Sequence, residues 1–110
     1  MTDKIVVLST CATADDAEML ARALVTGQLA ACVSVVPRVR SFYRWKGKLE
    51  TADEYLLIIK TSRDLFDALN AELERLHPFE VPEVLAIPVV AGAENYLNWL
   101  AVNLRGGTAE

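Results

Sequence analysis

The sequence predicts an α+β domain whose strands and helices follow the order β-α-β-β-α-β, with one added helix at the C-terminus. Three observations predict this class. Short apolar runs rich in β-branched residues are separated by segments whose apolar residues recur at helical spacing. A long stretch in the middle of the chain has the period of two that is typical of a hairpin. The length, 110 residues, suits one small domain.

The first strand and the first helix are predicted near the N-terminus. Residues 5–8 are apolar without alternation, which is typical of a central strand covered on both faces. Thr13 and Asp16 have the spacing of a capping box and predict the start of a helix. That helix is expected to end near Gly27. Its apolar stripe consists of Ala17, Leu20, Ala21, Leu24 and Val25.

A long hairpin is predicted for the middle of the chain. Residues 31–45 alternate as a strand, Lys46-Gly47 supplies a turn, and residues 48–61 form the partner strand. Both strands are longer than the usual length of about five or six residues. Pro37 predicts that the first strand lies at a sheet edge or carries a bulge, because proline has no N–H to donate.

A helix, a strand and a last helix are predicted after the hairpin. Thr61 and Asp64 have the spacing of a second capping box, and the helix is expected to end before His77-Pro78. Residues 84–87 read as a last core strand. The two helices carry the apolar stripes Leu65, Ala68, Leu69, Leu73 and Leu76, and Tyr96, Leu97, Leu100 and Leu104.

This order of elements is that of the ferredoxin-like, or split βαβ, arrangement. We expect residues 1–104 to form this single domain and residues 105–110 to form a flexible tail. Both crossover helices would cover one face of the sheet, so the central strands should alternate between apolar and polar residues. Residues 55–59 are instead apolar on both faces, and 53% of the chain is hydrophobic. We therefore expect the helix-free face to be buried against identical subunits.

Composition and charge exclude several classes of protein. A formal net charge of −4 gives no general attraction to nucleic acid. The longest apolar run, residues 55–59, is far too short to span a membrane, and no signal peptide is expected. Two cysteines without a C-x-x-C motif suit a reducing compartment, so we expect the cytoplasm.

The hairpin carries the one pattern that suggests RNA binding. Basic and aromatic residues interleave there as they do on RNA-stacking sheets. The central strand, residues 54–60, lacks the aromatic RNP motif that RNA-recognition modules place there, so we expect no nucleic-acid partner. The interleaved residues are Arg38, Arg40, Phe42, Tyr43, Arg44, Trp45, Lys46 and Lys48.

Cys32 and His77 are the first candidates for chemistry, because a thiolate and an imidazole can bind soft metals. They lie 45 positions apart, so their spacing does not establish a site. The simpler alternative is a packed thiol and a polar residue at a helix end. Residues 77–83 combine two prolines with Glu80 and Glu83, and form either a structural crossover or a rigid rim of charged side chains.

Five motifs, in order and with no large gaps, together resemble a known family. They are residues 29–33, 41–48, 59–61, 77–83 and 96–99. The series resembles the CutA family of divalent-cation tolerance proteins. The resemblance implies a cytoplasmic homotrimer of ferredoxin-like subunits, similar in architecture to the PII signalling proteins. It also implies a link to the tolerance of divalent metals, copper in particular, with copper binding for some members.

The resemblance also assigns candidate site residues by motif position. Cys32 and His77 are the matched residues for a metal. Six others would line the cleft between subunits, and these are Tyr43, Trp45, Glu54, Lys60, Glu80 and Glu83. Phe79 and Ser34 depart from the commoner tyrosine and asparagine, which puts in doubt any role for a phenol or an amide at those positions.

Two functions from different classes stay open. In the first, a trimer of the CutA type binds copper or another divalent metal and serves in the response to metal ions, with no cofactor required. In the second, a PII-like trimer presents its clefts to a partner protein or a small ligand. An enzyme of unknown substrate ranks third, because the spacing justifies no general acid–base pair and no catalytic residue is predicted.

Overall fold

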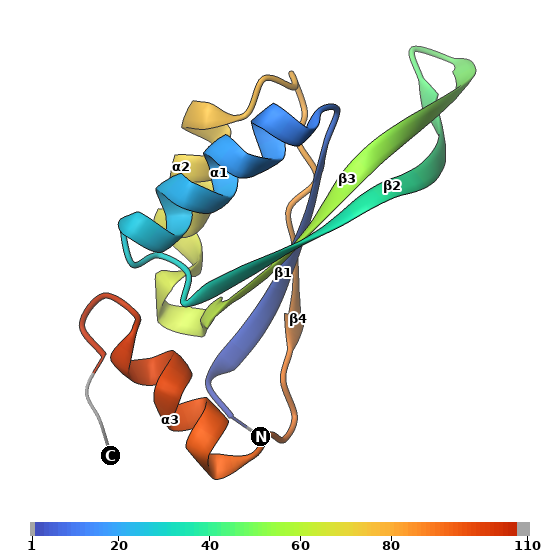
Figure 1. The fold of residues 1–110 in the computed structure, drawn as a ribbon. Coiled ribbons are helices and arrows are strands. Elements are labelled where there is room, and N and C mark those ends of the chain that lie inside the picture. The colour runs from blue at the N-terminus through green and yellow to red at the C-terminus, as the bar shows by residue number, and fades with distance from the viewer. Residues whose placement is uncertain (1, 108–110) are drawn as a thin grey trace.

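The computed structural model describes residues 2–107 and consists of a four-stranded antiparallel sheet with helices on one side (Figure 1). The strand order is β2-β3-β1-β4, as the ferredoxin-like arrangement requires, so the predicted fold class is confirmed. The elements are β1 Lys4–Cys11, α1 Ala14–Thr26, β2 Cys32–Trp45, β3 Lys48–Ser62, the short 3-10 helix η1 Arg63–Leu65, α2 Phe66–Leu76, β4 Leu85–Pro88 and α3 Glu94–Val102. None of the helices within residues 2–107 is long and apolar enough to span a membrane.

Helix α1 begins and ends where its sequence signals lie. The Asp16 backbone N–H donates to Thr13 Oγ1 at 3.0 Å, so Thr13 is the N-cap. Gly27 is the C-cap. The stripe residues Leu20 and Leu24 are fully buried against the sheet.

The hairpin of β2 and β3 has the predicted length, turn and irregularity. Lys46 and Gly47 have φ of 51° and 80°, which suits the turn types that join twisted antiparallel strands. The pairing shifts register between Val36 and Val39, so β2 is both an edge strand and a bulged one at Pro37. In Figure 1 the distal half of this hairpin extends beyond the layer of helices.

The start of the second helical segment differs from the prediction. Thr61 does not cap a helix, because it continues β3 and its buried hydroxyl donates to the Leu29 carbonyl at 2.7 Å. The chain turns first through η1, whose N-cap residue Ser62 makes no side-chain capping hydrogen bond. The local spacing assigned the Thr61 hydroxyl to a helix cap, but in the fold this hydroxyl makes a tertiary hydrogen bond instead.

The last strand was also predicted wrongly as a core strand. β4 pairs with β1 at one edge of the sheet, and all four of its residues are exposed in the single chain. Leu85 and Ile87 are 58% and 47% exposed. The sequence pattern of so short an apolar run is the same whether the strand is buried within its own chain or exposed at a sheet edge.

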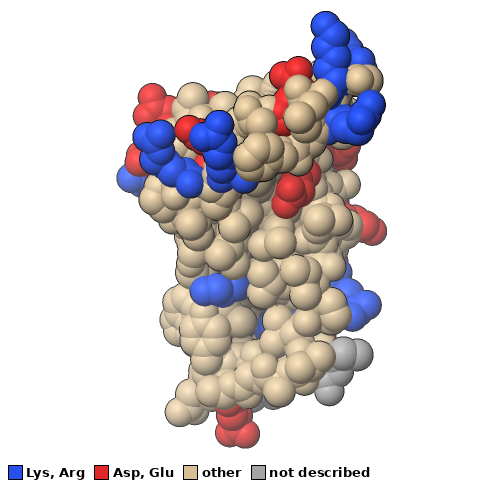
Figure 2. Space-filling model, turned by 90° about the vertical axis from the view of Figure 1, so that its right-hand side faces the viewer, with Lys and Arg blue, Asp and Glu red and all other residues tan. Residues whose placement is uncertain are grey.

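The two faces of the sheet differ in cover. Val7, Leu57 and Ile59 are fully buried beneath α1 and α2. On the other side, the strand register places a set of partly or largely exposed apolar residues that we call the helix-free face: Val6, Leu8, Val36, Leu56, Ile58, Leu85 and Ile87. Figure 2 looks onto this side, and its middle carries few charged side chains. β3 thus has one apolar face that the helices cover and one apolar face that they leave uncovered.

The C-terminal helix closes one end of the domain. Leu100 and Leu104 pack with Ala31 and Leu65 in a small second core. Beyond α3, Arg105 donates from its backbone N–H to the Gln28 carbonyl at 2.8 Å and from Nη2 to the Gly27 carbonyl at 2.9 Å. Residues 108–110 lie outside the described residues, and a flexible tail over 105–110 stays a prediction.

Replacing Thr61 by valine tests the tertiary role of its hydroxyl. The change keeps the shape of the side chain but leaves the buried Leu29 carbonyl without its donor, so we expect the free energy of unfolding to fall by roughly 1–3 kcal/mol. The measurement is denaturant unfolding at one fixed protein concentration. Thr51→Val, at an exposed position of the same strand, is the control and should change stability by less than about 0.5 kcal/mol. Equal losses in both variants would contradict the assignment.

Candidate functional site

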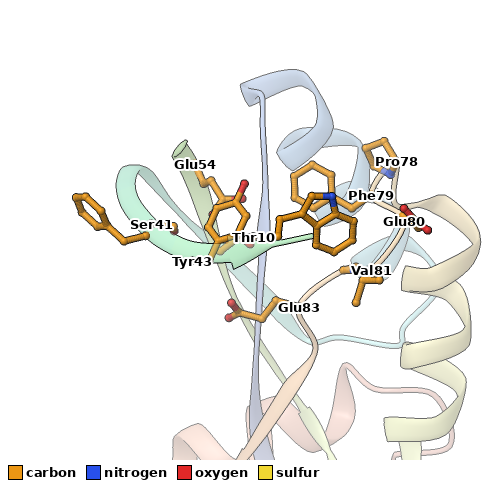
Figure 3. Close-up of a pocket in the computed structure, with 12 residues that line it drawn as sticks. Thr10, Ser41, Tyr43, Glu54, Pro78, Phe79, Glu80, Val81 and Glu83 are labelled. Atoms are coloured by element: carbon orange, nitrogen blue, oxygen red, sulfur yellow. The ribbon is translucent and has the colours of Figure 1, made fainter. Parts of the chain in front are cut away.

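A cleft of about 760 Å³ lies between the distal part of the hairpin and the segment that follows α2 (Figure 3). The hairpin contributes Ser41, Tyr43 and Trp45 from β2 and Glu54 from β3. Residues 78–83 form the opposite wall. Its volume is in the usual range for small-molecule sites, about 300–1,000 Å³.

The bulge in β2 helps to shape the cleft. Arg38 has φ of 64°, and the register shift between Val36 and Val39 bends the strand just before Ser41. The opposite wall is stiffened by Pro78 and Pro82, which fix φ at two of its positions. Both walls are therefore held by backbone geometry as well as by packing.

His77 anchors the wall formed by residues 78–83. Its ring Nδ1 accepts a hydrogen bond from the Phe79 backbone N–H at 3.1 Å. Since Nδ1 is the acceptor, the neutral ring carries its proton on Nε2, which lies 2.7 Å from the Thr10 carbonyl oxygen and donates to it. The side chain is buried, and the Phe79 ring packs on it with centroids 4.7 Å apart. Both imidazole nitrogens are thus engaged within the subunit.

Cys32 lies elsewhere, at the start of β2. It pairs in register with Lys60, and Lys60 Nζ lies 3.9 Å from Cys32 Sγ. His77 meets the sheet at Thr10, whose partner Leu56 precedes Lys60 by four positions on β3. At about 3.3 Å per residue this offset is roughly 13 Å along the strands. The structure does not bring Cys32 and His77 together within one chain.

The described residues contain no cluster of three or more His, Cys, Asp or Glu side chains placed to hold a metal ion. A metal at Cys32 or at His77 would need ligands from outside the described part of this subunit.

The structure gathers five of the six predicted cleft residues around one cavity. These are Tyr43, Trp45, Glu54, Glu80 and Glu83. The sixth, Lys60, lies beside Cys32 with its Nζ 5.9 Å from the ring centroid of Tyr96 on α3.

Sequence reasoning missed other residues of the cleft. Ser41 lines it beside Tyr43, and their spacing of two along β2 was a signal that could have found it. Thr10 also lines the cleft, but only the tertiary fold brings it there. No local pattern marks this position.

Cys11 is the second thiol, and it is fully buried in the core. Burial, which is the largest cause, and the nearby carboxylates of Asp16 and Glu54 together raise the pKa of the Cys11 thiol from 9.0 to about 11. A thiol in this state is a poor nucleophile and a poor metal ligand near neutral pH.

The chain matches one family model, that of the CutA1 divalent ion tolerance protein, over residues 5–103. The chain belongs to the CutA1 family. The predicted family resemblance is thereby confirmed over nearly the whole sequence.

Members of the CutA1 family occur in bacteria and in animals. The divalent-cation tolerance protein CutA of Thermus thermophilus is 43% identical over 98 residues, which are 89% of this chain and 95% of that protein. The mouse protein CutA is 45% identical over 91 residues, which are 83% of this chain and 51% of that protein. The chain thus spans about half the length of the mouse relative.

Solved structures of the CutA1 family have the same fold. The CutA structure from Xylella fastidiosa superposes with a TM-score of 0.92 at 39% identity, covering 94% of this chain and all of that one, at 100%. The Thermus thermophilus structure gives a TM-score of 0.90 at 41% identity, with 93% and 99% of the two chains covered. This chain, with its hairpin and helix-free face, therefore has the same fold as these two CutA structures.

The state of Cys11 can be tested in a Cys32→Ser variant, which leaves Cys11 as the single thiol. At pH 8, a rise of the pKa from 9.0 to about 11 lowers the thiolate fraction about 100-fold, so iodoacetamide should label native protein at least about 100-fold more slowly than protein in denaturant. Stability should also fall as pH rises from 9 towards 11, because the unfolded thiol ionises first while the folded one keeps its proton. A Cys11→Ala variant should lack that pH-dependent loss. Rapid native labelling would contradict the buried, protonated state.

Proposed function

We propose that this protein serves in the tolerance of divalent cations. The observation that carries this proposal is the family match over residues 5–103, supported by relatives from Thermus thermophilus and Pectobacterium atrosepticum that are named divalent-cation tolerance proteins at 43% and 42% identity. These names favour the tolerance function over the signalling or scaffold alternative.

The working form in this proposal is a homotrimer. The helix-free face supports it, because apolar side chains on all four strands lie there partly or largely exposed. β2 and β4 leave two edges of the sheet open to pairing with other strands. The exposed hydrophobic residues of the hairpin, Phe42 and Leu49 at 66% and 71%, are further surface that a second subunit would cover.

Copper or another divalent metal is the proposed cargo, and no resident cofactor is required. Cys32 supplies a half-exposed thiol on the helix-free side of the sheet, and thiolates suit soft ions such as copper. A single chain offers too few ligands there, so the proposal places the remaining ligands on other copies. His77 would have to give up its bond to Phe79 or to Thr10 before it could bind a metal.

The proposed compartment is the cytoplasm. Cys11 and Cys32 are both free thiols, as a reducing environment favours.

The oligomeric state can be measured by light scattering coupled to gel filtration. We expect a mass about three times the 12.1 kDa of one chain. Ile58→Glu places a charge in the middle of the helix-free face and should lower this mass, because an interface does not tolerate an unpaired buried charge. Ala71→Glu, on an exposed site of α2, makes the same change of charge and should leave the mass unaltered. A wild-type mass of one chain in dilute solution would overturn the trimer.

A copper titration under anaerobic, reducing conditions tests the metal proposal. We expect stoichiometric binding that weakens at least about tenfold in Cys32→Ser, since a hydroxyl is a poor ligand for soft copper. Cys11→Ala is the matched control, and its isotherm should equal that of the wild type because Cys11 is buried. Identical isotherms for wild type and Cys32→Ser would show that Cys32 is a packed thiol and no ligand.

His77→Gln separates an anchoring role from a ligand role in the same titration. Loss of the two ring hydrogen bonds should lower the free energy of unfolding by roughly 1–3 kcal/mol. Weaker copper binding in a variant of unchanged stability would instead identify His77 as a ligand.

A further inference from the structure

We propose that the cleft between the hairpin and residues 78–83 binds a primary ammonium group carried on a hydrocarbon chain, with a short diamine as the best fit. This goes beyond the tolerance of metal ions and does not depend on Cys32. It stands on a largely buried glutamate whose carboxylate has no partner within residues 2–107, on the charge of the lining, and on the aromatic character of the walls.

Glu54 is the central observation. It is only 7% exposed, and it lines the cleft from β3 (Figure 3). Among the described residues no hydrogen bond or ion pair reaches its carboxylate, whereas the neighbouring Asp53 pairs with Arg38 at 3.4 Å. The side chain is largely buried while its carboxylate oxygens keep some access to solvent, so a donor or a cation that reached them would replace the water they have lost. The cleft is the open side from which a donor or a cation can reach the Glu54 carboxylate.

The charge of the lining has one sign. Glu80 and Glu83 join Glu54 around the cleft, and no Lys, Arg or His is among the described residues that line it. Glu80 is exposed and Glu83 half-buried, and neither has an ion-pair partner among residues 2–107. Three carboxylates beside a concave, partly enclosed space attract cations.

The walls favour an organic cation over a bare metal ion. The carboxylates do not form a group that could hold a metal among the described residues. Tyr43, Trp45 and Phe79 supply aromatic rings, which attract ammonium groups and also pack against hydrocarbon. The hairpin already shows this attraction, because Lys46 Nζ lies 5.9 Å from the Trp45 ring centroid.

A primary ammonium suits Glu54 better than a quaternary one. It has three N–H donors, and the unpartnered carboxylate has acceptor sites for more than one of them. The hydrocarbon chain would lie along the aromatic walls, and a second ammonium at its far end would reach the carboxylates of Glu80 and Glu83. The same chemistry is found in a free diamine and in a lysine side chain of a neighbouring copy.

The probe is 1,4-diaminobutane, titrated at constant ionic strength into a Trp99→Phe variant in which Trp45 is the only tryptophan. We expect a saturable change in Trp45 fluorescence, weaker with 1-butylamine and absent with neutral 1-butanol. Tetramethylammonium, which has no N–H donor, should bind at least about tenfold more weakly than the diamine. A saturable response to 1-butanol as large as the one to the diamine would overturn the proposal.

Glu54→Gln in the same background should weaken diamine binding at least about tenfold, because it removes the charge while keeping the size. Glu50→Gln is the matched control, since Glu50 lies exposed on the same strand and does not line the cleft. Circular dichroism confirms that both variants fold. Equal losses of diamine binding in the two variants would mean that the effect comes from general electrostatics, and would overturn the proposed site.

The two sources of the ammonium group are separated by the Ile58→Glu variant. Binding of the diamine to the intact assembly supports a free amine as the ligand. Binding that arises only after the assembly is weakened supports a lysine of a neighbouring copy as the occupant. Absence of binding in both overturns the proposal. Cys32→Ser should keep diamine binding, so this result is independent of the outcome for copper.

Discussion

The unequal lengths of the four strands are the constraint on which the rest of the structure depends. β3 has 15 residues and β2 has 14, whereas β1 has 8 and β4 has 4. The hairpin therefore continues after its neighbours have ended, and its distal half has no helix beneath it (Figure 1). Its backbone is satisfied by its own ladder. Most of its side chains are not buried within the subunit, so this surface is available for a cleft and for subunit contact.

The early end of β4 has a second consequence. β4 pairs with β1 only from Ile5 to Leu8, and the Thr10 carbonyl lies beyond that pairing. His77 Nε2 donates to this carbonyl, so one imidazole takes the place of a missing strand. The same ring accepts from Phe79 and so sets the path of the cleft wall. The single histidine of the chain is thereby tied to the shape of the site even without any metal.

Local chemistry explains which parts of the fold could be predicted. The capping hydrogen bond at Thr13 and the turn at Lys46-Gly47 involve residues within four positions of one another, so their spacing is informative. Thr61 has the same local signal as Thr13, yet its hydroxyl bonds Leu29 at a distance of 32 positions in the chain. The exposed state of β4 and the separation of Cys32 from His77 likewise depend on the assembled sheet, which spacing along the chain does not report. The cleft residues on β2 follow strand alternation, whereas Thr10 reaches the cleft only through tertiary structure.

Electrostatics distinguishes the surroundings of Cys32 from the cleft as sites for cations. A cation that approaches Cys32 meets the ammonium of Lys60, whose Nζ lies 3.9 Å from the sulfur. Repulsion at that range means that only the strong affinity of sulfur for a soft ion could hold a metal there, and a hard ion such as Mg²⁺ would gain nothing. The cleft has the opposite balance, because three carboxylates and no basic side chain are among its described lining residues. Selectivity would then follow from chemistry as well as position, with soft metal at the thiol and organic cation at the carboxylates.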